Sequence, residues 1–385
     1  MLKKIFKRIK KILKEFLKKM INFIPFKVNS QKIIFDNFLG KGYGCNPKYI
    51  AEELIRQNID CDMVWLLKDL SCDLPPKIRK VKYGSLKACY ELATAKIWVD
   101  NVRNYKGINK KKGQFYIQTW HAPLGFKKVE KQVEEILSKK YVEEAKKDGE
   151  IADLMPVNNE YMANLIRDYF WYDGEIIKCG LPRNDIIGNP SETVCDKVYK
   201  YFGIDKTKKI VVYAPTFRTN GKIDAYKFDY KKILKEFSKV FDNDFVMLLR
   251  LHPNVSKSAK ELGYSKNVLN ATEYDDIQEI LAVADILITD YSSTMFDFSM
   301  FDKPVFLLMK DIDEYRKKER AIEFDLESLP FSIAFNEKEL CSNIRLFSDK
   351  KYKEKCDDFY NKIGLIKTNK ASEVLVERIK NKMLE

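Results

Sequence analysis

The chain has 385 residues and a net charge of +14, and 45% of its residues are hydrophobic. This length exceeds what one ordinary core accommodates, so we expect two domains. The eight cysteines form no CxxC pair and have no nearby histidine, which argues against a zinc site and a disulfide framework and fits a reducing cytosol. The chain also has no paired carboxylates of the DxD kind at a strand end, and we expect neither a metal nor a cofactor.

The excess positive charge is concentrated at the N-terminus. Residues 1–24 carry nine Lys or Arg and a single acid, Glu15. The rest of the chain is only mildly basic, and nucleic acid is therefore not an expected partner.

Residues 1–24 also predict an amphipathic helix, which Pro25 ends. Apolar residues recur every three or four positions and so line one helix face, while lysines cover the rest. Such a helix suits the surface of an anionic bilayer, although no run reaches the roughly 20 apolar residues of a membrane span. The alternative is a helix docked on the protein's own core. We expect a membrane-surface segment at 1–25, with contacts from Lys3, Lys4, Phe6, Lys7, Arg8 and Phe16.

Residues 26–188 predict the first of two α/β units, because short apolar runs alternate with helical stretches. The expected strands lie at 32–38, 63–67, 96–101 and 115–120, with helices at about 47–57 and 127–150. The glycine-rich turn at 39–45 does not match GxGxxG, since position 45 is Cys, so we exclude NAD.

The polar turn GNPSET marks the boundary to a second unit, residues 189–385. Four more strands, each followed by a polar loop, are expected within 208–218, 244–254, 284–293 and 303–308. We thus predict an α/β fold with two doubly wound, Rossmann-like domains facing a cleft. Ligands of such sheets bind beyond the carboxyl ends of the strands.

Polar and cationic groups gather at those strand ends in the second unit. The segment LITDYSSTMFDF predicts a strand followed by a helix whose N-terminus and serines suit a phosphate, although a plain serine cap is the alternative. The neighbouring loops TFR and RLHP add hydroxyl, guanidinium and imidazole groups, which together can neutralise a pyrophosphate without a metal. The candidate donor-binding residues are Thr216, Arg218, Arg250, His252, Asp290, Ser292 and Ser293.

The chain has only two histidines, and both follow apolar strands. His252 is a candidate phosphate ligand, with a core histidine bonded to backbone as the alternative. His121 lies in the first unit and faces the donor site across the cleft. A neutral imidazole there suits removal of a proton from an attacking hydroxyl, whereas a structural role at the turn before Pro123 is the competing interpretation.

Several of these segments resemble the CDP-glycerol glycerophosphotransferase family, the teichoic acid primases and polymerases. They occur in family order over about residues 30–345 and read QTWHAPL, CGLPRND, YAPTFR, RLHPN, DDIQEILAVADILITDYSSTMFDF and KPVFLLMKDIDEYR. The resemblance matches His121 to the acceptor-side catalytic histidine and His252 and the DYSS serines to the donor-phosphate site. It also matches Arg320 to a basic residue after the last donor-domain strand. Where the family segment reads HGTPLK, this chain has HAPLGFKK.

The resemblance implies a GT-B fold and peripheral, monotopic attachment to the cytoplasmic face of the cell membrane. It implies transfer of a polyol phosphate from a CDP-activated donor to a lipid-linked glycan or polymer, with release of CMP. We expect the polyol to be glycerol, but the resemblance leaves the choice between glycerol and ribitol open. The product would be a teichoic-acid-like or capsule polymer. The oligomeric state stays open.

Two other functions remain as alternatives. A GT-B glycosyltransferase would use a nucleotide sugar on the same scaffold. A non-catalytic basic module would bind a membrane or nucleic acid, but the basic residues of the body are not interleaved with aromatics along a groove.

Overall fold

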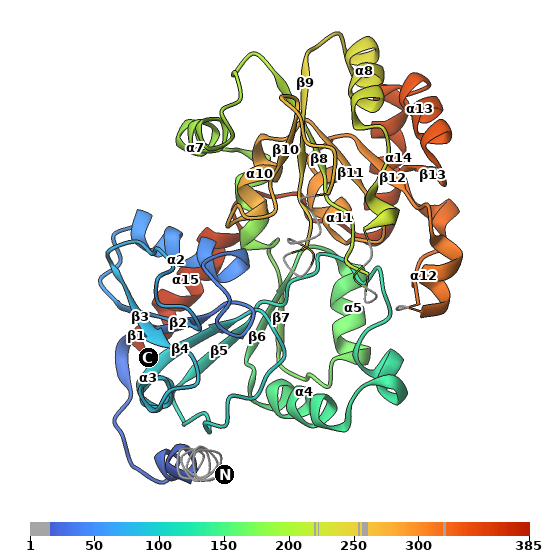
Figure 1. The fold of residues 1–385 in the computed structure, drawn as a ribbon. Coiled ribbons are helices and arrows are strands. Elements are labelled where there is room, and N and C mark those ends of the chain that lie inside the picture. The colour runs from blue at the N-terminus through green and yellow to red at the C-terminus, as the bar shows by residue number, and fades with distance from the viewer. Residues whose placement is uncertain (1–15, 219–220, 222, 253–254, 256–260, 319–320) are drawn as a thin grey trace, which may run out of the picture.

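The computed structural model describes residues 16–218, 221, 223–252, 255, 261–318 and 321–385. The chain forms two α/β units, each built around one parallel sheet (Figure 1). The first sheet has seven strands in the order β3-β2-β1-β4-β5-β6-β7, and the second has six in the order β10-β9-β8-β11-β12-β13. This confirms the predicted fold class of two Rossmann-like units.

The central strands of the first sheet are almost continuously apolar because helices cover both of its faces. Its strands are β1 (Asn29–Asp36), β2 (Asp62–Leu67), β3 (Ile78–Lys82), β4 (Ala95–Asp100), β5 (Phe115–Gln118), β6 (Leu154–Val157) and β7 (Glu175–Lys178). Its helices are α2 (Cys45–Arg56), α3 (Leu86–Thr94), the 3-10 helix η1 (Glu130–Ile136), α4 (Lys139–Ile151) and α5 (Glu160–Tyr169). The single helix predicted at 127–150 is thus split, because Ser138 caps a new helix that begins at Lys139, its hydroxyl accepting the backbone N–H of Tyr141.

The second unit repeats this arrangement after a short helical connection of η2 (Pro182–Asn184), α6 (Asp185–Gly188) and α7 (Glu192–Phe202). Its strands are β8 (Lys209–Tyr213), β9 (Phe245–Leu249), β10 (Val268–Asn270), β11 (Ile286–Thr289), β12 (Val305–Leu308) and β13 (Ser332–Ala334). Its helices are η3 (Asp224–Tyr226), α8 (Tyr230–Phe241), α10 (Ile277–Val283), α11 (Thr294–Ser299), α12 (Ile312–Lys318), η5 (Leu326–Ser328), α13 (Glu337–Arg345) and α14 (Asp349–Ile363).

The last helix, α15 (Ala371–Leu384), returns to the first unit. Leu375, Val376 and Ile379 belong to the same buried cluster as residues of β1, β2 and α2, and Figure 1 shows α15 beside α2. The structure therefore differs from the prediction that 189–385 forms one unit. An amphipathic pattern indicates that a helix packs on a hydrophobic core, but it does not indicate which of the two cores the helix covers.

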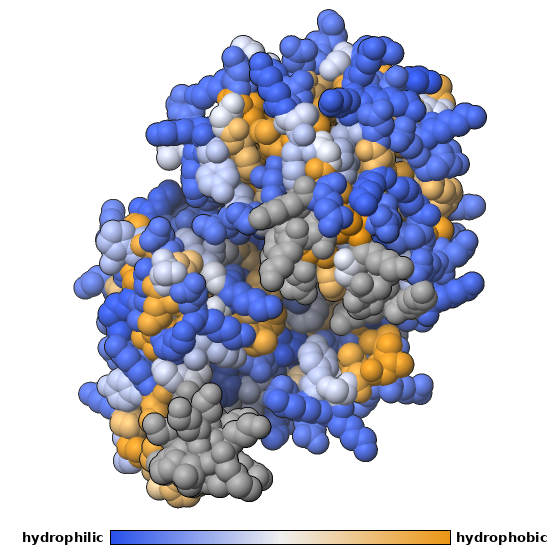
Figure 2. Space-filling model, in the orientation of Figure 1, coloured by the Kyte–Doolittle hydropathy of each residue, from blue (hydrophilic) through white to orange (hydrophobic). Residues whose placement is uncertain are grey.

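The N-terminal segment is described only from residue 16, and Lys3, Lys4, Phe6, Lys7 and Arg8 lie outside the described residues. Residues 16–21 are helical, and Phe16 and Phe23 are exposed. Figure 2 shows hydrophobic surface at this end of the molecule. None of the helices in the described part of the chain has the length and apolar character that a membrane crossing needs.

Candidate active site

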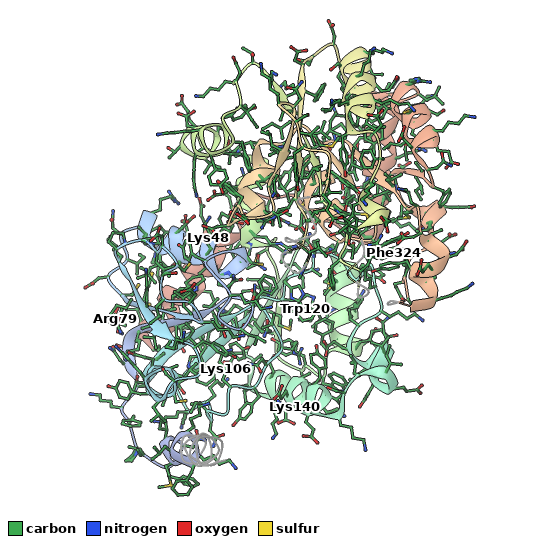
Figure 3. The ribbon with its side chains drawn as sticks, in the orientation of Figure 1. Lys48, Arg79, Lys106, Trp120, Lys140 and Phe324 are labelled. Atoms are coloured by element: carbon green, nitrogen blue, oxygen red, sulfur yellow. The ribbon has the colours of Figure 1, made fainter. Side chains whose placement is uncertain are left out.

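One cavity of about 790 Å³ lies between the two units and is lined by residues of both. Trp120 and His121 of the first unit contribute to one wall, and Arg250, His252 and Ser292 of the second contribute to another. Figure 3 shows Trp120 at the junction of the two units. The cavity opens at the carboxyl ends of the strands because β8 is paired with β9 and β11 in parallel, so the loops that follow them leave one sheet edge.

On the first wall, the loop after β5 holds His121 in a fixed orientation. The Nδ1 atom of His121 lies 2.9 Å from the carbonyl oxygen of Asn101, and the ring packs against Trp120 and Phe38. Trp120 has a φ of 51°, a left-handed conformation that costs free energy in a bulky residue and needs support from its surroundings. Part of that support is its backbone N–H, which donates to Oε1 of Gln118 at 3.0 Å.

On the second wall, Arg250 and His252 follow β9. One guanidinium nitrogen of Arg250, Nη1, donates to the carbonyl oxygens of Ala271 and Thr272 at 2.7 and 2.8 Å, which fixes the side chain at the rim of the sheet. His252 packs against Phe217. Burial, assisted by the positive charges of Lys41 and Arg250, lowers the pKa of His252 from its ordinary value. His252 is therefore neutral at pH 7 and meets a phosphate first as a hydrogen-bond donor.

Hydroxyl groups complete this wall. Ser292, Ser293 and Thr294 line the cavity, and the Ser292 hydroxyl donates to the Thr294 hydroxyl oxygen at 2.9 Å. Thr216 also lines the cavity and lies after β8. Helix α11 spans only six residues, so its dipole is small, and we expect hydroxyls and backbone N–H groups to contribute more to anion binding than the dipole does.

Arg218 and Asp290 lie behind the lining. Arg218 is buried and donates to Asp290 at 2.8 Å and to Asp311 at 2.7 and 2.9 Å. Asp290 also accepts the backbone N–H groups of Thr216 and Tyr291 at 2.7 and 2.6 Å. Neither side chain lines the cavity, although the sequence predicted donor contacts for both. Their contacts instead join the loops after β8 and β11.

Arg320 lies outside the described residues, but the segment that follows it contacts the first unit. The backbone N–H of Lys128 donates to the carbonyl oxygen of Ala321 at 3.0 Å, and that of Glu323 donates to the carbonyl oxygen of Phe126 at 2.9 Å. Lys127, between these contacts, lines the cavity. Within the described ranges, no three His, Cys, Asp or Glu side chains form a group that could hold a metal ion.

The cavity also depends on residues that the sequence pattern did not assign. Asn46 lies in the first turn of α2, and its side-chain amide donates to the carbonyl oxygens of Thr119 and Trp120 at 3.3 and 3.0 Å. Arg183 donates to the carbonyl oxygen of His121 at 2.5 Å. Asn46 gives no signal in a single sequence. Arg183 stands in the segment CGLPRND, whose place in the family pattern was the only available signal.

Residues 17–381 match the family model described as CDP-Glycerol:Poly(glycerophosphate) glycerophosphotransferase. The chain belongs to this family. The teichoic acid poly(glycerol phosphate) polymerase of Staphylococcus epidermidis is 31% identical to it over 91% of this chain and 51% of that protein. The Bacillus spizizenii polymerase of the same name is 30% identical over 91% of this chain and 92% of that protein. This chain thus spans about half of the first relative and most of the second.

Solved structures extend this family resemblance to the fold. The structure of the wall teichoic acid polymerase TagF has a TM-score of 0.82 and 28% identity, and the match covers 100% of this chain and 98% of that one. A TagF histidine variant soaked with CDPG gives a TM-score of 0.85 at 28% identity. The match to TagF confirms the GT-B-like architecture that the family resemblance implied.

Proposed function

We propose that this chain transfers glycerol phosphate from CDP-glycerol to a hydroxyl group of a teichoic-acid-like acceptor and releases CMP. The observation that carries the proposal is that His121 of one unit and the Arg250, His252 and serine groups of the other line a single cavity. Family membership supports the identity of the donor, and the relatives named for glycerol phosphate support glycerol over ribitol.

The proposed reaction uses groups from both walls of the cavity. The acceptor oxygen attacks the β-phosphorus of CDP-glycerol in line with the bridging oxygen, and the bond from that phosphorus to the bridging oxygen breaks. CMP carries away the electron pair of this bond, while the proton of the acceptor hydroxyl passes to the imidazole of His121. Arg250, His252 and the cavity hydroxyls stabilise the charge on the diphosphate.

The other predicted donor residues have supporting places in this proposal. Arg218 and Asp290 act indirectly, by fixing the loops that carry Thr216 and Ser292. Arg320 is included as a phosphate contact on the family resemblance alone. Residues 26–188 form the acceptor side, and the second sheet with its helices forms the donor side.

The acceptor is proposed to be lipid-linked, with the protein held peripherally at the cytoplasmic face of the cell membrane. The exposed apolar side chains between residues 16 and 24 support this. The sequence pattern of residues 1–24, with lysines opposite an apolar face, also predicts an interfacial helix.

The test is release of CMP in the presence of lipid-linked glycerol-phosphate acceptors. Parallel reactions contain CDP-glycerol, CDP-ribitol or a UDP-sugar at equal concentration. We expect CMP release with CDP-glycerol to be fastest and to depend on the acceptor. Turnover of the UDP-sugar in preference to both CDP-polyols would overturn the proposal, and preference for CDP-ribitol would change the polyol.

A further inference from the structure

The side chain of Arg183 lies where the two units meet. It belongs to η2, on the connection between the sheets, and the residue is only 7% exposed. Its Nε and Nη2 atoms donate to Asp297 of α11, with distances of 3.1, 2.8 and 2.6 Å to the two carboxylate oxygens. Asp297 is itself only 2% exposed. The bidentate geometry fixes the orientation of the guanidinium plane as well as its position.

The remaining guanidinium nitrogen is directed at the loop that carries His121. Nη1 of Arg183 donates to the carbonyl oxygen of His121 at 2.5 Å. The backbone N–H of Arg183 donates to Oδ1 of Asn46 at 3.1 Å, and Asn46 in turn binds the carbonyls of Thr119 and Trp120. Arg183 and Asn46 together therefore hold three successive carbonyl groups, including that of the left-handed Trp120.

The other end of the contact lies on the opposite wall. Asp297 is in the same short helix as Thr294, which lines the cavity directly after Ser292 and Ser293. A single buried ion pair thus joins the backbone of His121 to the element that carries the cavity hydroxyls. No other ion pair found among the described residues makes this connection.

We propose that Arg183, held by Asp297, is a positioning residue that sets the place of His121 relative to the hydroxyl-bearing loop 292–294. This inference rests on the proposed function, because it states that the ion pair sets the distance between the base, His121, and the phosphorus atom that is attacked. Neither Arg183 nor Asp297 lines the cavity, so neither side chain contacts the substrates. Misplacement of a catalytic group by about 1 Å can lower the rate about 10²-fold. A substitution that shortens or weakens the contact between Arg183 and Asp297 should therefore lower turnover, although it removes no phosphate ligand.

The test uses Arg183→Lys and Asp297→Asn in the full chain. Lysine keeps the charge but cannot bind Asp297 and His121 in one plane, and asparagine still offers one oxygen to Arg183. We expect kcat to fall about 10- to 100-fold, with the larger loss for Arg183→Lys, while the Kd for CDP-glycerol changes less than about threefold. If Arg183→Lys does not fold, the milder Asp297→Asn decides.

Lys48→Gln is the matched control. Lys48 is also buried at the junction (Figure 3) and donates to Asp276 and Glu279 of the second unit at 2.7 Å each, yet it does not line the cavity. Its replacement weakens the contact between units without touching the loop of His121. If kcat falls as much in Lys48→Gln as in Arg183→Lys, then Arg183 only holds the two units together, and the inference is overturned.

A second measurement is independent of activity. Because the chain contains only two histidines, ring-¹⁵N-labelled protein gives two sets of imidazole signals, which His252→Gln assigns. Arg183→Lys is expected to shift the His121 signals and leave those of His252 in place, whereas Lys48→Gln shifts neither set. Unchanged His121 signals in a folded Arg183→Lys protein would overturn the inference.

These two measurements also separate the inference from the proposed function. If wild-type protein neither binds nor consumes CDP-glycerol, the proposed function fails, and the histidine spectra still report whether Arg183 positions His121. If the wild type is active and both Arg183→Lys and Asp297→Asn retain its kcat, the proposed function stands and the positioning role is lost.

Discussion

The Nδ1 atom of His121 lies 2.9 Å from the carbonyl oxygen of Asn101. A carbonyl oxygen can only accept a hydrogen bond, so Nδ1 carries the proton of the neutral ring and Nε2 carries the lone pair. The hydrogen bond therefore selects the tautomer, and the surrounding aromatic rings limit rotation of the imidazole. This orientation suits the proposed role of His121 as a base, because the nitrogen that would accept the proton is fixed in the protein without substrate.

Replacement of His121 by glutamine should separate binding from chemistry. His121→Gln is expected to lower kcat by about 10² to 10⁴, the usual contribution of a general base, and to leave the Kd for CDP-glycerol nearly unchanged because the residue belongs to the opposite wall. Calorimetry gives Kd and CMP release gives kcat. Full turnover, or loss of donor binding in a folded variant, would remove His121 from the role of base.

Donor binding should respond to pH through His252. Burial, with the charges of Lys41 and Arg250, lowers the pKa of this imidazole in the protein without substrate, whereas a bound diphosphate favours the imidazolium and raises it. Binding therefore takes up a proton, and affinity should increase as the pH falls from about 8 to about 6. The affinity of His252→Gln should be lower and nearly flat with pH, while His121→Gln keeps the wild-type slope. If the affinity of His252→Gln changes with pH as much as that of the wild type, His252 is not the group that takes up the proton.

The fold was largely predictable because parallel sheets covered on both faces need apolar runs, and such runs stand out in the sequence. The residues of β2 and β4 are examples. β3 was missed because its sequence IRKVK carries three cations, which a peripheral strand tolerates on its solvent side. The destination of α15 was not predictable, since its amphipathic pattern fits either sheet.

The candidate site was predictable to the level of the sheet edge. Thr216, Arg250 and Ser292 all reach the cavity because parallel strands end on the same side. The direction of each side chain was not predictable. Arg218 follows the same strand as Thr216 but turns back to Asp290 and Asp311, because those carboxylates offer buried partners that only the folded chain brings close.

The junction between the units depends on a buried ion pair that should be sensitive to substitution. Lys48 of α2 lies 2.7 Å from both Asp276 and Glu279, and all three side chains are buried. Lys48→Gln leaves two buried carboxylates with less compensation, which we expect to cost about 3 to 5 kcal/mol of unfolding free energy. Lys353→Gln is the control: it removes a pair of the same 2.7 Å length on the exposed face of α14 and should cost less than about 1 kcal/mol. The free energy of unfolding is measured by urea denaturation. An equal loss in Lys48→Gln and Lys353→Gln would show that burial of the ion pair does not matter.

Membrane binding should depend on the N-terminal segment and can be tested without removing its structural contacts. Ile21 joins the core of the first unit, and Asn22 donates from its side chain to the carbonyl oxygen of Gly107 at 3.1 Å. Deletion of residues 1–19 therefore spares both contacts, whereas a longer deletion also removes part of the fold. The shortened protein should no longer sediment with vesicles of anionic phospholipid.

A pair of point variants separates a specific membrane face from general hydrophobicity. Phe23 is 80% exposed beside the N-terminal helix, and Leu346 is 78% exposed directly after α13. Figure 1 shows α13 at the opposite end of the molecule from the N-terminus. Transfer of a large apolar side chain from water into lipid contributes about 1.5 to 3 kcal/mol, so Phe23→Ser should weaken vesicle binding about tenfold or more. Leu346→Ser should leave vesicle binding unchanged.

Added salt should weaken vesicle binding of the wild type, because it screens the attraction between the lysines and the anionic headgroups. Equal effects of the two variants, or sedimentation of the shortened protein with vesicles, would place the membrane contact elsewhere on the surface.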